Sequence, residues 1–314
     1  MILSSGVERQ PLPVGCMLSL KGERVLQDHW LRRHFYYQRG ISKVDWVKEK
    51  EVALEAALEA GRYIKQRLGR IDRIDYKSAF NIVTDVDKSS EALIVEHIKQ
   101  AFPADSIVAE EGSGASEKPS NRCWFIDPLD GTTNFTHSYP FFAVSIGFAS
   151  DDAMVVGVVY SPVSDEKFVA VKGQGAYLND QRIAVSTVSD IETSLLATGF
   201  PADTSTATFN NLEIFQELTN RTHGVRRDGS AALDLCFVAT GRLDAFWEMK
   251  LSPWDVAAGS LIVEEAGGRV TNLVSGEFDR YSGHILASNG LIHQDVAQIL
   301  KTFRAVRTTH DVKA

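Results

Sequence analysis

Residues 124–135 read Trp124-Phe-Ile-Asp127-Pro128-Leu129-Asp130-Gly131-Thr132-Thr133-Asn134-Phe135, an apolar run that ends abruptly in two aspartates three residues apart. The uncharged residues Cys123 to Ile126 include aromatic and β-branched side chains, and this pattern predicts a short buried strand. Pro128 restricts Asp127 to an extended conformation and fixes its own φ near about −65°. The chain therefore turns in a defined direction, and we expect the Asp130 carboxylate to face that of Asp127, an arrangement that suits a divalent metal.

Gly131 adds a place for an anion to this turn. Glycine lets the backbone approach a ligand closely, and the threonines that follow it could open a helix whose free N–H groups receive a phosphate. The alternative is an Asx-turn followed by a helix cap, in which both aspartates only satisfy backbone N–H groups. Asp-Pro alone is common, whereas the full string favours the metal and anion site.

The composition indicates a globular protein with a sizeable core. The 314 residues are 44% hydrophobic, and 41 acidic against 33 basic residues give a formal charge of −8. This balance argues against nucleic acid or an anionic membrane as a partner. No window reaches the roughly 18 consecutive apolar residues of a membrane span. The three cysteines, Cys16, Cys123 and Cys236, are too scattered for a disulfide framework or a zinc site, so we expect a reducing, cytoplasmic location.

Residues 1–45 differ in character from the rest of the chain. They have no charged start followed by an apolar core, and the cluster Arg32-Arg33-His34-Phe35-Tyr36-Tyr37-Gln38-Arg39 is basic and aromatic. Glu8, Glu23 and Asp28 argue against a transit peptide. We interpret residues 1–45 as an N-terminal extension, 46–306 as the folded domain and 307–314 as a C-terminal tail.

Apolar periodicity predicts helices and strands in separate blocks, which indicates a layered α+β architecture. The segment Asp72 to Asp87 is polar and without period, and we expect a loop there. Helices are expected at Val47 to Leu68, Lys88 to Phe102, Ser230 to Thr240, Pro253 to Ala266 and Ile292 to Phe303. Strands are expected at Ser106 to Ala109, Cys123 to Ile126, Phe141 to Ala149, Met154 to Tyr160, Glu166 to Val171, Leu243 to Trp247 and Ile285 to Ala287, with antiparallel pairing in the three-strand run.

Several other charged residues have a purely local interpretation when each is taken alone. Glu110, beside Glu111 at a strand end, is typical of a solvated loop. Asp87 and Asp255 lie at helix starts, where an acid caps the helix or is favoured by its dipole. Lys77 is an ordinary loop cation, and Glu248 an ordinary acid at a strand end.

Taken together, these segments resemble the inositol monophosphatase family of magnesium-dependent, lithium-sensitive phosphatases, from about Val47 to Lys301. The most specific signatures are residues 124–135 and Trp254-Asp255-Val-Ala-Ala-Gly259 with Glu264-Glu265-Ala266-Gly267-Gly268. Ala109-Glu110-Glu111, Asn81-Ile-Val-Thr84-Asp85-Val86-Asp87 and Gly229-Ser230-Ala231-Ala232 support them. The resemblance implies an inositol monophosphatase-like αβαβα sandwich, a catalytic domain at 46–306 and a homodimer.

The family's residue roles can be carried over where the motifs match. The resemblance implies that Glu110, Asp127 and the carbonyl of Leu129 hold one Mg²⁺, while Asp127, Asp130 and Asp255 hold a second. Mg²⁺ prefers such oxygen ligands and keeps several waters. Thr132 would orient the attacking water with Asp87 behind it, and Glu110 is a competing base.

The resemblance also implies substrate contacts. These are the Gly131 and Thr132 amides for phosphate, Asp130, Ser230, Ala231 and Glu248 for the alcohol part, and Lys77 as a loop contact.

The resulting hypothesis is a Mg²⁺-dependent phosphomonoesterase acting on a small polyol phosphate, above all myo-inositol 1-phosphate. Fructose 1,6-bisphosphate and nucleotide 3′-phosphates are rival substrates within the family. Thr133-Asn134-Phe135 resembles the inositol branch, whereas the residues around Glu248 do not reproduce an inositol-selective pattern. A different class, a non-catalytic partner- or RNA-associated protein, is suggested by the basic and aromatic cluster at 32–39.

Overall fold

The apolar run before Asp127 lies in β4 (Arg122–Asp130), a strand inside a seven-stranded sheet. Eight of its nine residues are buried, all but Arg122, which explains the absence of charge from Cys123 to Ile126. The structure, a computed structural model, describes residues 45–71, 73–78, 81–112, 120–201, 204 and 211–310. The expected N-terminal extension, apart from Asp45, and residues 311–314 lie outside these described residues.

The seven-stranded sheet has the order β3-β4-β5-β6-β7-β8-β9. Only β3 and β4 are parallel among its neighbouring pairs, and the expected antiparallel pairing of the three-strand run is confirmed. The strands other than β4 are β3 (Ser106–Ala109), β5 (Ala143–Ser150), β6 (Ala153–Ser161), β7 (Glu166–Val171), β8 (Gly175–Leu178) and β9 (Gln181–Arg182).

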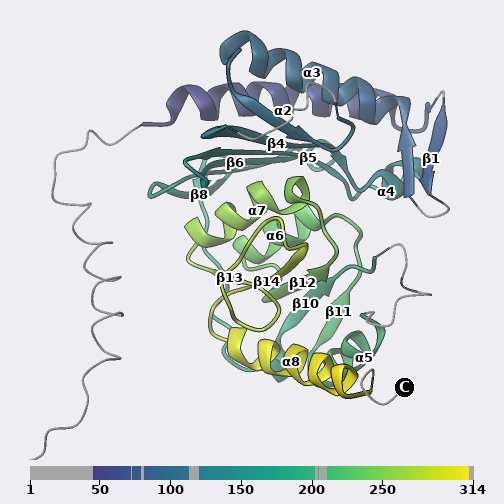
Figure 1. Cartoon of the computed structure of the whole chain (residues 1–314), viewed down its shortest axis with the longest axis vertical. Helices are drawn as coiled ribbons and strands as arrows, with labels where there is room; N and C mark the ends of the chain where they lie inside the picture. The colour runs from purple at the N-terminus through teal and green to yellow at the C-terminus, as the bar shows by residue number, and fades with distance from the viewer. Residues whose placement is uncertain are drawn as a thin grey trace, which may run out of the picture. The chain divides into compact units, whose positions relative to one another are not determined.

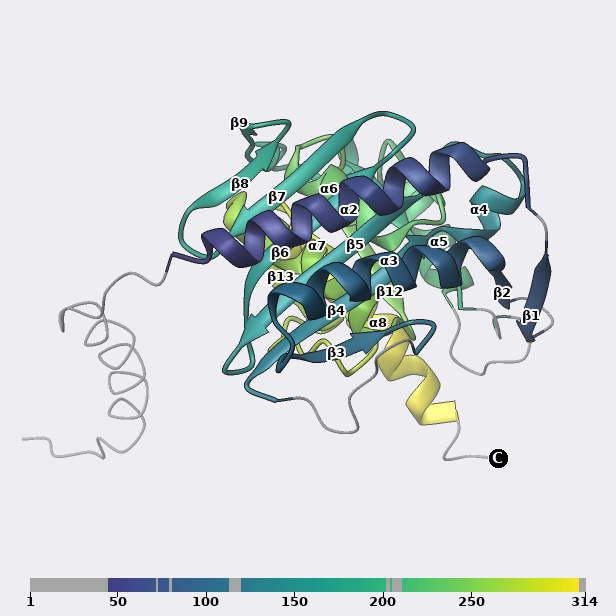
Figure 2. The same ribbon diagram turned by 90° about the horizontal axis from the view of Figure 1, so that it is seen from above.

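Two long helices cover one face of this sheet. α2 (Val47–Arg67) packs on β5 and β6, and α3 (Asp85–Ala101) packs on β4. Figure 2 shows both helices running side by side over the strands. Small buried residues on α2, including Ala53, Ala57 and Ala60, let the helix lie close to the sheet.

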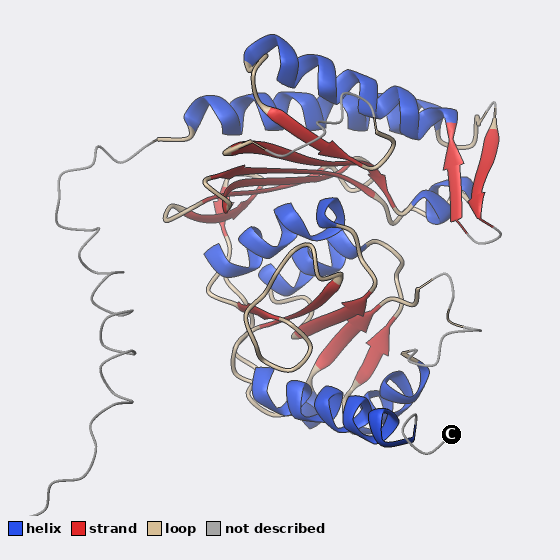
Figure 3. Cartoon of the chain, in the orientation of Figure 1, coloured by secondary structure: helices blue, strands red, loops and turns tan. Residues whose placement is uncertain are grey.

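The opposite face is covered by α6 (Ala231–Ala239) and α7 (Pro253–Glu265), which lie between the two sheets (Figures 1 and 3). All residues from Val256 to Val263 are buried, as expected for a helix that is packed on both sides. A continuous apolar sequence inside a helix is therefore the local signal for the middle layer.

The second sheet has five strands in the order β11-β10-β12-β14-β13, and helices cover its far side. α5 packs against β11, and α8 packs against β14. The layers are thus helix, sheet, helix, sheet, helix, and the expected αβαβα architecture is confirmed (Figure 1). The elements are β10 (Leu195–Thr198), β11 (Gly224–Arg226), β12 (Ala245–Met249), β13 (Arg269–Thr271), β14 (His284–Ser288), α5 (Leu212–Arg221), α8 (His293–His310) and the 3-10 helix η1 (Ile191–Thr193).

The prediction of a loop from Asp72 to Asp87 is wrong. The segment forms an antiparallel hairpin of β1 (Ile74–Ser78) and β2 (Asn81–Thr84), and α3 already begins at Asp85. Ile74-Asp75-Tyr76-Lys77 alternates between apolar and polar residues, but this run has only four residues, and Ile74 is 42% exposed. So short an alternation does not by itself separate a strand from a loop, and the hairpin is defined by its backbone pairing.

None of the helices in the described part of the chain is long and apolar enough to cross a membrane.

Candidate functional site

A bulge in β4 brings Asp127 and Asp130 to the same side of the sheet. Asp127 is paired with Ser145 of β5 and Asp130 with Ala143, so three residue steps on β4 oppose two on its neighbour. In a regular strand, residues three apart point to opposite faces, and the one extra residue reverses this. Pro128 lies within the bulge, where its missing N–H costs no ladder hydrogen bond. The strand therefore continues through the turn expected after Ile126, and the two carboxylates share one side.

Parallel pairing of β3 with β4 places Glu110 at the same edge. Ala109 is paired with Ile126, and the Glu110 N–H donates to the Ile126 carbonyl at 3.2 Å. Glu110 thus leaves its strand beside the position where Asp127 follows Ile126.

Gly131 then turns the chain into α4 (Thr132–Thr136). Its φ of 95° and ψ of 35° are left-handed values that glycine adopts without strain. The helix that was expected to open here is present but has only five residues. Any anion at this turn would therefore depend on the individual N–H groups more than on a helix dipole.

Asp87 lies behind Thr132. The Thr132 hydroxyl lies 2.8 Å from Asp87 Oδ1, to which it donates, and 3.1 Å from the Leu129 carbonyl. The other Asp87 oxygen accepts from the Thr84 N–H at 2.8 Å, which closes a capping box at the start of α3. Burial raises the pKa of Asp87, and its hydrogen bonds to the two threonines oppose that rise. α3 begins three residues earlier than expected, so Asp87 lies inside its first turn and not directly before it. There it both caps α3 and positions Thr132.

Asp255 and Asp130 also combine a structural hydrogen bond with a place in the site. Asp255 accepts from the Ser252 N–H at 2.7 Å, in the capping box of α7. Asp130 accepts from the Ser230 hydroxyl at 2.5 Å and from the Ala232 N–H at 2.8 Å, both at the start of α6. The two central helices are thus fixed to the acid cluster by their first turns.

A hollow of about 180 Å³ collects these groups from separate elements. Asp87 and Ser230 stand behind its wall, each bonded to a lining residue. Lys77 belongs to β1, and its side chain lies outside the described part. The predicted residues that line the hollow are Glu110, Asp127, Leu129, Asp130, Gly131, Thr132, Ala231, Glu248 and Asp255.

Four residues of the lining were not predicted: Gly199, Arg227, Gly229 and Leu251. Gly229 and Arg227 stand in or beside the quoted Gly229-Ser230 motif, so an arginine there was a signal that could have been used. Gly199 has no such signal; a Cβ on it would lie 2.0 Å from Glu248 Oε1, because the Glu248 carboxylate lies over it.

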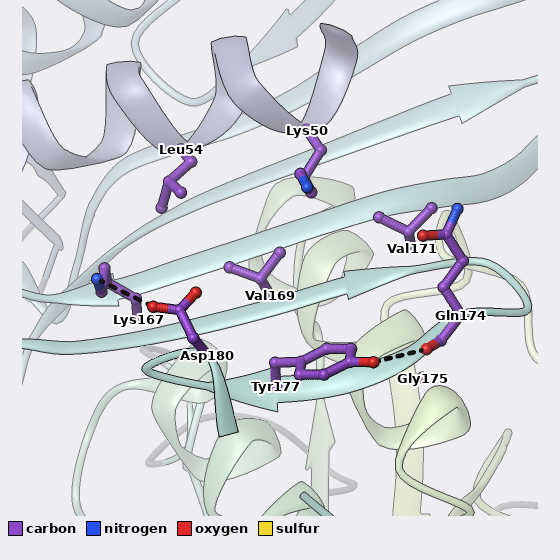
Figure 4. A pocket seen from close by; sticks show the side chains of 9 residues that line it. All are labelled: Lys50, Leu54, Lys167, Val169, Val171, Gln174, Gly175, Tyr177 and Asp180. Atoms are coloured by element: carbon purple, nitrogen blue, oxygen red, sulfur yellow. Dashed lines mark hydrogen bonds and ion pairs between the residues drawn. The ribbon is translucent and has the colours of Figure 1, made fainter. Parts of the chain in front are cut away.

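A larger hollow, of about 320 Å³, lies elsewhere, between α2 and the β7 and β8 strands (Figure 4). Its lining includes Lys50, Lys167, Val169 and Tyr177 and none of the predicted residues. The chemistry therefore assigns the site to the smaller hollow.

The clustered acids raise one another's pKa values. The pKa of Asp127 is raised well above its usual range, first by burial and then by Glu110, Asp130 and Asp255. Burial, followed by Asp130, raises the pKa of Asp255 to about 8. Burial, followed by Asp255, raises that of Glu248 to about 8. Burial raises the pKa of Asp130 to about 6 against the opposing hydrogen bonds from Ser230 and α6.

The donor set fits Mg²⁺, although the side chains do not form a ready-made cage. Among the described residues, no group of three or more His, Cys, Asp or Glu is already arranged to hold a metal ion. Mg²⁺ nevertheless prefers carboxylate and carbonyl oxygens, keeps several waters and needs few protein ligands. A dication among these acids would also relieve the repulsion and burial that raise their pKa values.

These pKa values predict a pH-dependent stabilisation by Mg²⁺. The metal-free folded chain keeps its protons on Asp130 up to about pH 6 and on Asp255 up to about pH 8, whereas the unfolded chain releases them at about pH 4. Between these limits the folded state binds more protons, so the metal-free protein loses stability as the pH rises. Bound Mg²⁺ requires the ionised acids, so its stabilising effect should grow over the same range.

Thermal unfolding with saturating Mg²⁺ or with EDTA checks this expectation. The rise in Tm on adding Mg²⁺ should be about 5 °C greater at about pH 8 than at about pH 5.5. An equal rise at both pH values would contradict it.

Comparisons with known proteins point to the family that the sequence motifs resemble. The model of the inositol monophosphatase family matches residues 45–305. An inositol-1-monophosphatase of Synechocystis is 48% identical over 251 residues, which are 80% of this chain and 88% of that protein. The solved inositol monophosphatase of Anabaena has a TM-score of 0.75 and 44% identity, and the match covers 81% of this chain and 96% of that one.

One relative bears a different kind of name. The Nus factor SuhB of Pseudomonas aeruginosa is 42% identical over 264 residues, which are 82% of this chain and 94% of that protein. This name gives no support to the expectation that nucleic acid is not a partner. The family match and these identities, each over about four fifths of the sequence, show that the chain belongs to the inositol monophosphatase family of phosphatases.

Proposed function

We propose that this chain is a Mg²⁺-dependent phosphomonoesterase that hydrolyses a small polyol phosphate, with myo-inositol 1-phosphate as its leading substrate. One observation carries the proposal: nine residues predicted for metal, water and substrate line a single hollow, although they come from separate strands, helices and loops. The name of the Synechocystis relative favours the inositol ester. We further propose that residues 46–306 form the catalytic domain.

Five groups in the hollow would hold Mg²⁺. Glu110, Asp127 and the Leu129 carbonyl would bind one ion, and Asp127, Asp130 and Asp255 a second. A bound pair supplies the charge that lowers the pKa of the attacking water and neutralises the leaving alkoxide.

The remaining residues bind and orient. The Gly131 and Thr132 amides would donate to phosphate oxygens, because Gly131 leaves the turn without a side chain. Ser230 and Ala231 lie at the start of α6 beside Asp130, and Glu248 reaches the same hollow from β12. Ala231 and Glu248 would contact the alcohol part, with Glu248 accepting hydrogen bonds from its hydroxyls, while Ser230, behind the wall, would position Asp130.

Thr132 and Asp87 are favoured over Glu110 as the pair that positions the attacking water. The Thr132 hydroxyl donates to Asp87 and keeps lone pairs with which it can accept from a water. Thr132→Ala should lower kcat by about 10²- to 10³-fold while Mg²⁺ affinity is retained. Glu110→Gln should first weaken Mg²⁺ binding.

Steady-state kinetics as a function of Mg²⁺ separates these effects. The exposed neighbour offers the control Thr133→Ala, which should behave as wild type. If Thr132→Ala keeps its kcat and Glu110→Gln loses kcat at saturating Mg²⁺, Glu110 is the base and the assignment is wrong.

A panel of phosphate esters tests the proposed function. The purified full-length chain with Mg²⁺ should show its highest kcat/KM for phosphate release on myo-inositol 1-phosphate. Fructose 1,6-bisphosphate and a nucleoside 3′-phosphate are the rivals, and lithium should inhibit turnover. An absence of Mg²⁺-dependent release from every ester would refute the proposal, and a clear preference for a rival would reassign the substrate.

The basic and aromatic cluster at 32–39 favours a second candidate role, in partner binding. We propose that residues 1–45, with their basic and aromatic cluster at 32–39, bind single-stranded RNA independently of catalysis. Fluorescence anisotropy with a labelled RNA oligonucleotide should show binding by the full chain and loss of binding without residues 1–45, with phosphatase activity unchanged. Equal binding by both chains would refute this role.

A further inference from the structure

Gly199 and Glu248 meet at the wall of the hollow because the strands that lead to them are neighbours. β10 and β12 lie side by side in the five-stranded sheet (Figure 1), and Thr198 is paired with Trp247. The residues that follow this pair, Gly199 and Glu248, both line the hollow. A Cβ on Gly199 would lie 2.0 to 2.3 Å from the Glu248 carboxylate atoms, so the carboxylate lies on bare backbone. Its place therefore depends on how the two strands are held together.

The side chain of Asn211 joins these two strands. Asn211 is fully buried and stands directly before α5. Its Nδ2 donates to Thr198 Oγ1 at 2.6 Å and to the Gly199 carbonyl at 2.8 Å, and its Oδ1 accepts from Trp247 Nε1 at 2.7 Å. The indole can only donate, and both amide hydrogens are used. The amide of Asn211 therefore has one orientation.

The Thr198 hydroxyl carries this link on to Glu248. It donates at 2.6 Å to the Trp247 carbonyl, which belongs to the peptide between Trp247 and Glu248. Asn211, Thr198 and Trp247 are each 0% exposed, and none of them lines the hollow. A buried set of hydrogen bonds in which each side chain has its partners is rigid. The three side chains thus hold the backbone beneath the Glu248 carboxylate from behind the wall.

We infer that Asn211 is a positioning residue for substrate selection, which fixes the Glu248 carboxylate over Gly199 where it accepts from hydroxyls of the alcohol part. The inference rests on the proposed phosphatase activity and adds a residue that sets its preference among esters. Hydrogen bonds weaken steeply when they are misaligned, so a displaced carboxylate should bind hydroxylated alcohols less well. The hydrogen bonds of Asn211 reach no metal-binding acid and no residue of the phosphate turn, so an ester without hydroxyls should be cleaved as before.

Two phosphate esters separate this role from a general structural one. myo-Inositol 1-phosphate offers hydroxyls to Glu248, whereas the alcohol part of phenyl phosphate offers none. With the full-length chain and Mg²⁺, Asn211→Ala should raise KM for the inositol ester about tenfold and leave its kcat within about twofold. On phenyl phosphate, kcat/KM should stay within about twofold of wild type, because no hydrogen bond to Glu248 is lost. In a Glu248→Ala background, adding Asn211→Ala should not change the ratio of the two kcat/KM values further.

Thr198→Val and Thr198→Ser test the same link with the asparagine in place. Valine keeps the shape and loses the hydroxyl, so it should shift the ratio of the two esters as Asn211→Ala does. Serine keeps the hydroxyl and should retain the wild-type ratio. This pair decides the question if Asn211→Ala does not fold.

Asn289→Ala is the matched control. Asn289 is also buried, and its amide donates to Ser186 Oγ at 2.9 Å and to the Val188 carbonyl at 2.7 Å, away from the lining of the hollow. It should lower Tm in the same way and leave the ratio of the two esters unchanged.

Three results would overturn the inference about Asn211. These are an unchanged ratio of the two kcat/KM values in Asn211→Ala and Thr198→Val, an equal loss on both esters, and a further change of the ratio in the Glu248→Ala background. Failure of the proposed function is distinguishable, since the wild type would then release phosphate from neither ester.

Discussion

Asp127→Asn should lower kcat/KM for myo-inositol 1-phosphate by about three orders of magnitude, the largest effect expected of any single side chain. Asp127 is 2% exposed, and the proposed arrangement gives it to both Mg²⁺ ions. An amide keeps the shape but loses the negative charge, so both ions lose a ligand and several kcal/mol of transition-state stabilisation.

Stability separates loss of chemistry from loss of fold in this variant. In EDTA at about pH 8, the Tm of Asp127→Asn should be at least that of wild type. The variant removes a buried acid that Glu110, Asp130 and Asp255 repel. Asp180→Asn, at an acid whose side chain is 95% exposed, is the control and should change neither property. Wild-type turnover by Asp127→Asn would refute the metal assignment.

Gly131→Ala should lower kcat/KM by about 100-fold through the geometry of the phosphate turn. The left-handed φ of 95° makes alanine unfavourable there by about 1–2 kcal/mol. The added Cβ would lie 3.0 Å from the Phe141 carbonyl oxygen and 3.3 Å from that of Gly229, so the backbone must shift. A small displacement of the donors at the reacting phosphate is enough for a loss of this size.

Gly267→Ala is the matched control for this variant. Gly267 has a φ of 89°, and no described atom lies within 4 Å of its Cβ position. It should lose similar stability from backbone strain, measured as Tm, with kcat/KM unchanged. An equal loss of activity in both variants would show that strain alone, and not the position of the turn, limits turnover.

Elements with a strong apolar signal could be predicted from the sequence. α7 and the run of β5, β6 and β7 were found within two residues at each end, because buried helices and strands show long apolar segments. β8, β9, β11 and β13 have two to four residues each and are too short to show a period. Their regularity depends on pairing with distant strands.

α5 was missed although an asparagine, a residue typical of helix starts, stands directly before it. Its N-cap, Asn211, makes no capping hydrogen bond with its side chain. That side chain donates instead to Thr198 Oγ1 at 2.6 Å and accepts from Trp247 Nε1 at 2.7 Å. The start signal was therefore present in the sequence, and in the folded chain this asparagine makes tertiary contacts in place of a cap.

The site residues also fall into two groups, those with a local sequence signal and those brought together only by the fold. Asp127, Asp130 and Gly131 are close in sequence, and local chemistry predicted their convergence. Glu110, Glu248 and Asp255 could be joined to them only by resemblance, because strand pairing and helix docking bring them together. Gly199 and Leu251 lacked either signal, and their place in the hollow follows from the folded backbone alone.

The most direct test of this account counts the cations. Titration of the metal-free chain with Mn²⁺, followed by electron paramagnetic resonance, should show at least two bound ions per wild-type chain. Asp127→Asn should lose the pair, and Asp255→Asn should lose one ion and keep the other. A wild-type chain that binds no Mn²⁺, or variants that bind it as tightly as wild type, would contradict the claim that these separated acids together form one metal site.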